Sequence, residues 1–372
     1  MKQGWEIKKL GEVATYINGF AFKPEQWTDN GIPIIRIQNL NNPSAPYNYC
    51  DFEVPPKYLV EQGDILISWS ASLGVYEWNN DNGYLNQHIF KVVFDKGNIN
   101  KYYFKYAVAS KLNIMLENLH GATMKHIVKK DFDNTLIPVP PLPEQEKIVS
   151  ELDCLSGIIE KKRQQLKELD ALAQSIFYEM FGNPVDNERG WEVKKLGDSC
   201  TFQQGIQVPI EEQFEEQEDG MVRFLRIVDF TQGNEKPRYI HTNSEKHILK
   251  NEEIAIVRYG TPGFVCYGKY GAIANNLFKI MPLKNDISFM FLVYWLKSEA
   301  FQSVVVGNQY GAALQAIKFS TIRDIPIFLP PLPLQQSFAQ KIEAIEQQKA
   351  LIKQSIAEVE TLFNARMQEY FE

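Results

Sequence analysis

The sequence contains an internal repeat of domain length. WEIKKLG at residues 5–11 returns as WEVKKLG at residues 191–197, with six identities in seven positions at an offset of 186. PPLP at residues 140–143 returns at residues 330–333, at an offset of 190. Solenoid repeats are about 20 to 50 residues long, so this unit is a whole domain. The 372 residues therefore predict two related globular domains.

The second copy carries a short insertion. The offset grows by 190 − 186 = 4 between the pairs Gly19/Gly205 and Arg36/Arg226. In this interval the second copy holds the acidic run EEQFEE at residues 211–216. We interpret this run as a surface insertion.

A seven-residue periodicity follows each proline-rich boundary. A 4,3 spacing of apolar residues held over about five heptads is typical of a coiled-coil seam. The first stripe is interrupted by Lys162 and the second by Lys349 and Arg366. The stripes consist of Ile148, Leu152, Leu155, Ile159, Leu166, Leu169, Ala173, Ile176 and Met180, and of Phe338, Ile342, Ile345, Ile352, Ile356, Val359, Phe363 and Tyr370.

These stripes predict two long helices that pair with each other. A helix of about 38 residues would be about 57 Å long, which is longer than a domain of about 140 residues is wide. An amphipathic helix lying on its own domain is the alternative. The two lysines either set the register of the pair or mark a solvated edge. The proline segments are interpreted as stiff connections to the helices, with a proline-rich ligand as the alternative.

The globular parts mix short strands with one or two helices, which predicts an α+β domain twice over. Helices are expected at residues 102–119 and 289–305. Strands are expected at residues 32–37, 64–68 and 89–94, and at residues 222–228, 253–258 and 277–281.

Composition and charge limit the class of protein. No stretch approaches the roughly 18 apolar residues of a membrane span, and the first residues lack the apolar core of a signal peptide, so we expect a cytoplasmic protein. The net charge is 39 − 46 = −7, which argues against nucleic acid only if the chain works alone. The four cysteines are far apart and are expected to be free buried thiols.

No catalytic or metal-binding motif is present. The five histidines have no metal-ligand spacing, and neither a nucleophile elbow nor a glycine-rich phosphate loop occurs. The Glu-x-Lys at residues 6–8 and 192–194 lacks the well-placed upstream Asp that a restriction-type nuclease site needs. We therefore expect neither catalytic nor metal-binding residues.

Polar and aromatic residues cluster where the expected strands end. Arg, Asn, Gln, Lys and Ser are the side chains that read base edges in the major groove. The clusters are residues 68–72, 86–88 and 123–126 in the first copy, and residues 258–261, 275–276, 309–310 and 315 in the second. Loops are polar in every protein, so this pattern alone leaves an ordinary surface role open.

Taken in order, these motifs resemble the specificity subunits of type I restriction-modification systems. The resemblance covers essentially the whole chain. It depends on the WE-x-KKLG openings, the Gly19 and Gly205 turns, the Arg-Ile pairs at 36–37 and 226–227, DILI at 64–67 with Ser72-x-Gly74, Asn86-Gln87, and PPLP-x-x-Q before each heptad helix. In the second copy Ser72-Leu73-Gly74 becomes Thr261-Pro262-Gly263, and Asn86-Gln87 becomes Asn275-Asn276 or shifts by one.

The resemblance implies an α+β fold of two target-recognition domains joined by two long antiparallel coiled-coil helices with pseudo-two-fold symmetry. The expected domains are residues 1–143 and 183–333, and the expected helices are residues 144–182 and 334–372. Each domain would read one half of a bipartite, asymmetric site on double-stranded DNA, with the helices as spacer.

The resemblance also implies that this chain is not an enzyme. Two modification subunits carrying S-adenosylmethionine would dock on it, and restriction subunits that use ATP would join them, so no cofactor is expected in this chain. A coiled-coil scaffold that reads no DNA, and a self-sufficient nuclease or methyltransferase with a diverged site, are the alternatives. The DNA-contacting residues predicted are Arg36, Gln38, Ser70, Gln87 and Lys125, with Arg226, Arg258, Asn275, Tyr310 and Gln315.

Overall fold

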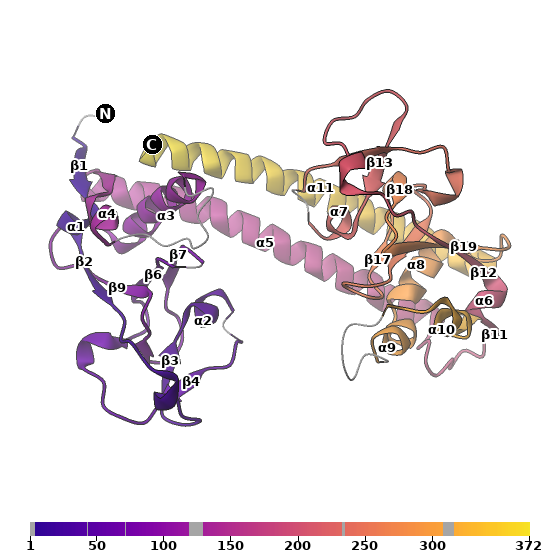
Figure 1. Ribbon diagram of the computed structural model, residues 1–372, viewed down its shortest axis with the longest axis horizontal. Coiled ribbons are helices and arrows are strands. Elements are labelled where there is room, and N and C mark those ends of the chain that lie inside the picture. The colour runs from indigo at the N-terminus through magenta and orange to yellow at the C-terminus, as the bar shows by residue number, and fades with distance from the viewer. Residues whose placement is uncertain (1–3, 43, 71, 119–128, 233–234, 308–315) are drawn as a thin grey trace. The chain divides into compact units, whose positions relative to one another are not determined.

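The computed structural model describes residues 4–42, 44–70, 72–118, 129–232, 235–307 and 316–372, with side chains 113–118 and 306–307 left aside. The chain forms two compact units. Unit 1 combines residues 1–163 with residues 354–372, and unit 2 is residues 164–353. Each unit therefore contains one globular head and about half of each of two long helices, α5 (Leu142–Phe181) and α11 (Leu332–Phe371) (Figure 1).

The head of unit 1 contains two four-stranded sheets and a two-stranded ribbon. The first sheet has the order β2 (Thr15–Asn18), β9 (Ile89–Val93), β6 (Ile65–Ser68), β7 (Gly74–Glu77). The second has the order β4 (Asn48–Cys50), β3 (Ile32–Ile35), β8 (Gly83–Leu85), β5 (Leu59–Val60), and the ribbon pairs β1 (Glu6–Lys9) with β10 (Leu136–Val139). Its helices are α1 (Leu10–Val13), α2 (Ile37–Asn41), α3 (Lys101–Asn118) and α4 (Lys129–Asn134).

The head of unit 2 has the same strand order. Its sheets are β12 (Cys200–Gln204), β19 (Leu277–Pro282), β16 (Ile254–Val257), β17 (Val265–Cys266), and β14 (Arg238–His241), β13 (Met221–Leu225), β18 (Gly271–Ile273), β15 (Ile248–Leu249). The ribbon pairs β11 (Glu192–Lys195) with β20 (Pro326–Leu329). Its helices are α6 (Leu196–Ser199), α7 (Ile227–Thr231), α8 (Phe289–Lys297), α9 (Glu299–Gly307) and α10 (Phe319–Arg323). The repeated topology confirms the two related α+β domains.

Two of the expected elements end earlier than the sequence suggests. The strand expected at residues 32–37 ends at Ile35, because Arg36 is the N-cap residue of α2. Arg226 is likewise the N-cap of α7, so the second strand ends at Leu225. In both copies the arginine therefore lies at a strand-to-helix turn and not within a strand.

The helix expected at residues 289–305 is two helices. Ser298 is extended, with φ −70° and ψ 159°, and separates α8 from α9. Its hydroxyl donates to the carbonyl oxygen of Trp295 at 2.6 Å. A serine hydroxyl satisfies such a terminal carbonyl group, which makes an interruption inexpensive here.

The long helices run antiparallel within each unit. In unit 1, the Glu151 carboxylate binds Arg366 at 2.8 Å, and the Arg163 guanidinium binds Glu360 at 2.7 Å. The numbering therefore rises along α5 while it falls along α11. In unit 2, the Lys349 ammonium binds Asp170 of the other helix and Glu346 of its own, both at 2.7 Å. Lys349 thus closes an ion pair across the helices, as a register-setting residue would.

The repeated glutamine after each proline boundary explains the PPLP-x-x-Q motif. Gln145 is buried, and its amide donates to the carbonyl of Pro140 at 2.7 Å and accepts from the backbone N–H of Asn100 at 2.8 Å. Gln335 donates to the Pro330 carbonyl at 2.8 Å and accepts from the N–H of Ser288 at 2.8 Å. Each glutamine ties the start of a long helix to the start of a helix in the head.

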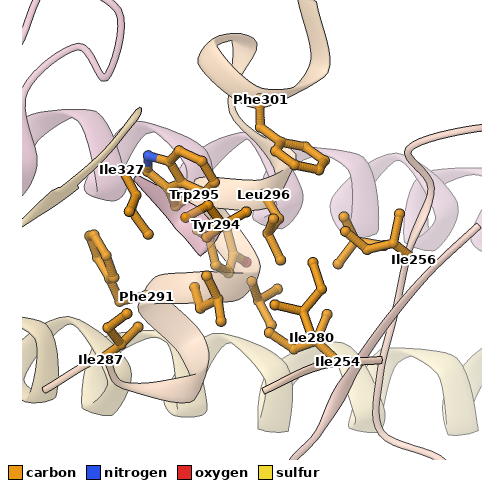
Figure 2. Close-up of a cluster of buried hydrophobic side chains, with 14 of the residues drawn as sticks. Ile254, Ile256, Ile280, Ile287, Phe291, Tyr294, Trp295, Leu296, Phe301 and Ile327 are labelled. Carbon is orange, nitrogen blue, oxygen red and sulfur yellow. The ribbon is translucent and has the colours of Figure 1, made fainter. Parts of the chain in front are cut away.

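The ends of the long helices form part of the head cores. In unit 2, Phe177 and Phe338 pack on Phe291 and Tyr294 of α8. Figure 2 shows α8 side chains such as Phe291 and Trp295 gathered in one cluster with sheet residues such as Ile254. The start of each long helix packs on the head that precedes it in the chain, whereas its end packs in the core of the other unit. The alternative of a helix lying only on its own domain is therefore wrong.

Candidate nucleic-acid interface

Four of the predicted reading residues follow the ends of paired parallel strands, and this end of the sheet is called its edge here. Strands β3 and β8 are parallel, and Ile35 pairs with Leu85. The backbone N–H of Asn86 donates to the carbonyl of Ile35 at 3.1 Å. Arg36 and Gln87 therefore leave the sheet at the same edge, because adjacent parallel strands end together. In unit 2, β13 and β18 are parallel in the same way, which places Arg226 and Asn275 at the equivalent edge.

The bridges between loops fix how the two copies correspond. Phe20 bridges Asn86 in unit 1, and Ile206 bridges Ala274 in unit 2. Asn86 therefore corresponds to Ala274, and Gln87 corresponds to Asn275. The sequence left open whether Asn86-Gln87 corresponds to Asn275-Asn276 or is shifted by one residue. The structure has the shifted alignment.

A glycine lets the backbone approach closely at this edge. A Cβ on Gly19 would lie 2.0 Å from the carbonyl oxygen of Asn86, and one on Gly205 would lie 2.2 Å from that of Ala274. No side chain fits there. The two glycine turns therefore hold the loops that carry Gln87 and Asn275.

In unit 1, Arg36 is surrounded by an aromatic ring and amides. Its guanidinium lies 4.9 Å from the centre of the Trp27 ring, and Nη1 donates to Oδ1 of Asn48 at 2.8 Å. Among the described residues, no carboxylate is paired with it. Gln38, the second residue of α2, donates through its side-chain amide to the carbonyl of Pro46 at 3.1 Å.

The other described candidates of unit 1, Gln87 and Ser70, lie in loops that backbone hydrogen bonds connect at this edge. The N–H of Gln87 donates to the carbonyl of Phe20 at 2.9 Å. The N–H of Trp69 donates to the carbonyl of His88 at 3.3 Å. The loop that carries Ser70 is therefore hydrogen-bonded to the loop that carries Gln87. Lys125 lies outside the residues that the structure describes.

In unit 2, the same edge forms a pocket of about 630 Å³. Its lining includes Arg226 and Asn275, together with Gln207, Gln232 and Tyr259. The Asn275 amide accepts from the Tyr259 hydroxyl at 3.1 Å and donates to Oε1 of Gln207 at 3.3 Å. The pocket thus presents an arginine, five amides, a phenol and the carboxylate of Glu235.

The arginine of unit 2 has a different electrostatic environment. Asp229 has a fully buried side chain that binds Arg226 at 3.1 Å and Arg223 at 2.6 Å. Arg226 also approaches Glu235 at 3.6 Å. The residue that corresponds to Asp229 in unit 1 is Asn39. The two heads therefore offer equivalent arginines, one held by carboxylates and one by amides.

Arg258 points away from this pocket. Its Nε donates to the carbonyl of Ile317 at 3.1 Å, and its guanidinium lies 5.7 Å from the centre of the Phe319 ring. It is therefore placed beside the segment that leads into α10. The predicted residues Tyr310 and Gln315 lie outside the described part of the chain.

Several residues of this edge escaped the sequence prediction. Gln207 and Gln232 line the pocket, and Trp27 and Asn48 hold Arg36. Tyr259 belonged to the polar cluster at residues 258–261 but not to the predicted contact residues. Only Gln207 carried a repeat signal, since it lies two residues after the repeated glycine. The others come from segments in which the two copies differ.

The described residues hold no group of three or more His, Cys, Asp or Glu side chains that could bind a metal ion. Burial raises the pKa of both Cys200 and Cys266 to about 12, so these thiols stay protonated at neutral pH. None of the helices described is long and apolar enough to cross a bilayer.

The sequence profile described as "Type I restriction modification DNA specificity domain" matches residues 2–170 and 188–361. The chain belongs to this family. The profile covers both heads and much of both long helices, so the repeat seen in the sequence is a repeat of the family domain. The chain is thus a DNA-specificity subunit with two target-recognition domains.

Related proteins agree over most of their length. The chain is 22% identical over 376 residues to the type I restriction enzyme EcoBI specificity subunit of Escherichia coli, covering 92% of this chain and 79% of that protein. It is 23% identical over 396 residues to the StySPI specificity subunit of Salmonella potsdam, covering 93% and 82%. The chain is also similar to the crystal structure of a type I restriction-modification S subunit from M. genitalium. The match covers 99% of this chain and 96% of that subunit, with a TM-score of 0.56 and 14% sequence identity. At that identity the match shows a shared fold.

The close approach at Gly205 makes a test of the edge possible. We expect Gly205→Ala to lower the free energy of unfolding by about 1 to 3 kcal/mol, because the new methyl group displaces the Ala274 backbone. Gly157→Ala is the control, since nothing lies within 4 Å of its Cβ and it is helical; it should stabilise by about 0.5 to 1 kcal/mol. Chemical denaturation measures both. Equal effects would show that the glycine turn does not hold the loop.

Proposed function

We propose that each head reads one half of a bipartite, asymmetric site on double-stranded DNA, and that the paired helices are the spacer. The observation that carries the proposal is the repeated sheet edge. Its backbone is built twice from the same landmarks, whereas its side chains differ, with Arg36, Trp27 and Gln87 in one head and Arg226, Tyr259 and Asn275 in the other.

The chemistry of these side chains suits base edges. Arginine pairs in bidentate fashion with guanine, and Asn or Gln pairs with adenine in the major groove. An edge with unlike side chains in the two heads would bind two unlike half-sites. Two unlike half-sites would explain why the two family domains share one fold but carry different side chains at this edge.

The charge of the heads supports a function within a larger complex. Residues 1–144 carry 14 − 15 = −1, and residues 183–333 carry 16 − 18 = −2. Phosphate contacts supply essentially all sequence-blind affinity for DNA, so neither head should bind DNA strongly alone. We propose that two modification subunits with S-adenosylmethionine supply this charge and the methylation, and that restriction subunits use ATP. This assembly would act in the cytoplasm, where its DNA is.

The long helices offer matching positions for two such subunits. Leu172 on α5 and Leu362 on α11 occupy equivalent repeat positions, at an offset of 190. They are 49% and 46% exposed, although leucine is usually buried. This equivalent pair has one leucine in each unit, Leu172 in unit 2 and Leu362 in unit 1, as a pair of identical partners would require.

Exchange of one head tests the proposed function. Replacing residues 1–143 by the corresponding head of another specificity subunit, in the complex with its modification subunits, should change one methylated half-site and leave the other unchanged. Sequencing methylated adenines in cells measures both half-sites. A change in neither half-site would contradict reading by the heads.

Two further outcomes separate the alternatives. Binding without any sequence preference, with and without modification subunits, would favour a scaffold that does not read DNA. Methylation or cleavage of DNA by the purified chain alone, abolished by a point substitution, would favour a self-sufficient enzyme.

Substitution of the exposed leucines tests the docking positions. We expect Leu172→Asp and Leu362→Asp each to weaken binding of one modification subunit at least about tenfold, because a charge would enter an apolar contact. Leu351→Asp is the control: this leucine is 68% exposed, but its repeat counterpart is Lys161. Sedimentation of the assembled complex should give one partner instead of two for each single variant. Loss of both partners, or of neither, would be inconsistent with one site per repeat.

A further inference from the structure

A group of cations beside the pocket is present in the second head alone. Arg223 lies on β13, Arg238 is the first residue of β14, and Lys236 lies two residues before that strand. Lys236 is linked to the pocket residue Arg226, whose Nη2 donates to the Lys236 carbonyl at 2.9 Å. In the first head the three corresponding residues, at an offset of 190, are Pro33, Pro46 and Asn48.

These cations have two kinds of partner. Arg223 and Arg226 bind Asp229, whose side chain is fully buried and also accepts from the backbone N–H of Arg226 at 2.9 Å. Asp229 is therefore part of the fold. Lys236 and Arg238 instead bind Glu215, at 3.6 and 3.1 Å. The Glu215 side chain is 51% exposed.

Glu215 belongs to the acidic insertion. The neighbouring residue Phe214 exchanges two backbone hydrogen bonds with Tyr239 of β14, at 2.9 and 2.8 Å. The first head makes the same pairing between Thr28 and Tyr49. The extra residues of the second head therefore follow Phe214, and they place Glu215 beside Arg238. The insertion thus supplies the carboxylate that the exposed Lys236 and the half-buried Arg238 bind in this structure.

We propose that Lys236 and Arg238 bind a phosphate group of the DNA backbone, and that Glu215 occupies this position until DNA replaces it. The inference depends on the proposed function and adds the place where the second head contacts the backbone. A carboxylate and a phosphate are both anions that bind a guanidinium through charge-assisted hydrogen bonds. One can therefore replace the other on the same side chains.

The exchange has a consequence for specificity. Each DNA molecule must displace Glu215 before it gains the phosphate contact, whatever its sequence. Sequence-blind binding is weakened by this competition, whereas a cognate half-site gains its base contacts in addition. The acidic insertion therefore makes the second head depend more on sequence than its cations alone would allow.

Glutamine substitution in the assembled complex tests the competition. The probes are a 30-base-pair duplex of random sequence and the duplex that carries the methylated site found in cells. We expect Glu215→Gln to bind the random duplex about three to ten times more tightly, with a salt dependence steeper by about one to two in logarithmic slope, since about 0.9 is gained per phosphate contact. Glu216→Gln, the adjacent residue of the same insertion, should change the affinity less than twofold.

Two more variants assign the effect to the cations. Lys236→Gln and Arg238→Gln should each weaken binding to both duplexes, and Arg238→Gln combined with Glu215→Gln should abolish the gain. Lys236 is 80% exposed, so its substitution leaves the fold intact and keeps the test valid if Arg238→Gln is unstable.

Three results would overturn the proposal. These are no gain for Glu215→Gln, an equal gain for Glu216→Gln, or a gain that persists without Arg238 and Lys236. Failure of the proposed function would look different, because the unsubstituted complex would then bind both duplexes equally.

Discussion

The structure depends on the burial of both ends of each long helix in a head. The start of α5 contributes Ile148 and Leu152 to the core of unit 1, and its end contributes Phe177 and Phe181 to the core of unit 2. The start of α11 enters the core of unit 2 through Phe338. Burial of one such side chain contributes about 1.5 to 3 kcal/mol. Neither head has a complete core without both helices.

This arrangement separates the residues that hold the fold from those that read. Gln145 and Gln335, buried at the two helix starts, make the same hydrogen bonds in both copies. Gly19 and Gly205 allow the same close approach. Between these landmarks the copies share little, and the sheet edge carries different side chains. A duplicated domain can therefore change its target without losing its fold.

The sequence predicted the elements whose signal is local. The heptad stripes predicted α5 and α11, because a seven-residue period of apolar residues can be recognised within one helix without knowing which helix it pairs with. The strand β6 was predicted from its continuous apolar run, and β9 from its β-branched and aromatic residues. Arg36 was placed within a strand, because the N-cap position depends on Asn39 accepting from its backbone N–H, a contact that strand propensity does not contain.

The composition of the pocket could not be predicted in the same way. It depends on the parallel pairing of β13 with β18, strands separated by almost fifty residues, and on a one-residue shift between the copies. Of the predicted residues, Arg226 and Asn275 line this pocket together, whereas the guanidinium of Arg258 lies over the ring of Phe319. Contact of any of these residues with DNA stays a prediction.

The central claim is that the paired helices, anchored in both cores, set the distance between the half-sites. Insertion of one heptad after Arg163 and one after Lys353, at the two points where the chain passes from one unit to the other, tests it most directly. Seven residues lengthen each helix by about 10 Å, which is about three base pairs of DNA at 3.4 Å each. Sequencing of methylated adenines should then give both half-sites unchanged, with a spacer about three base pairs longer. An unchanged spacer between the same half-sites would contradict the account.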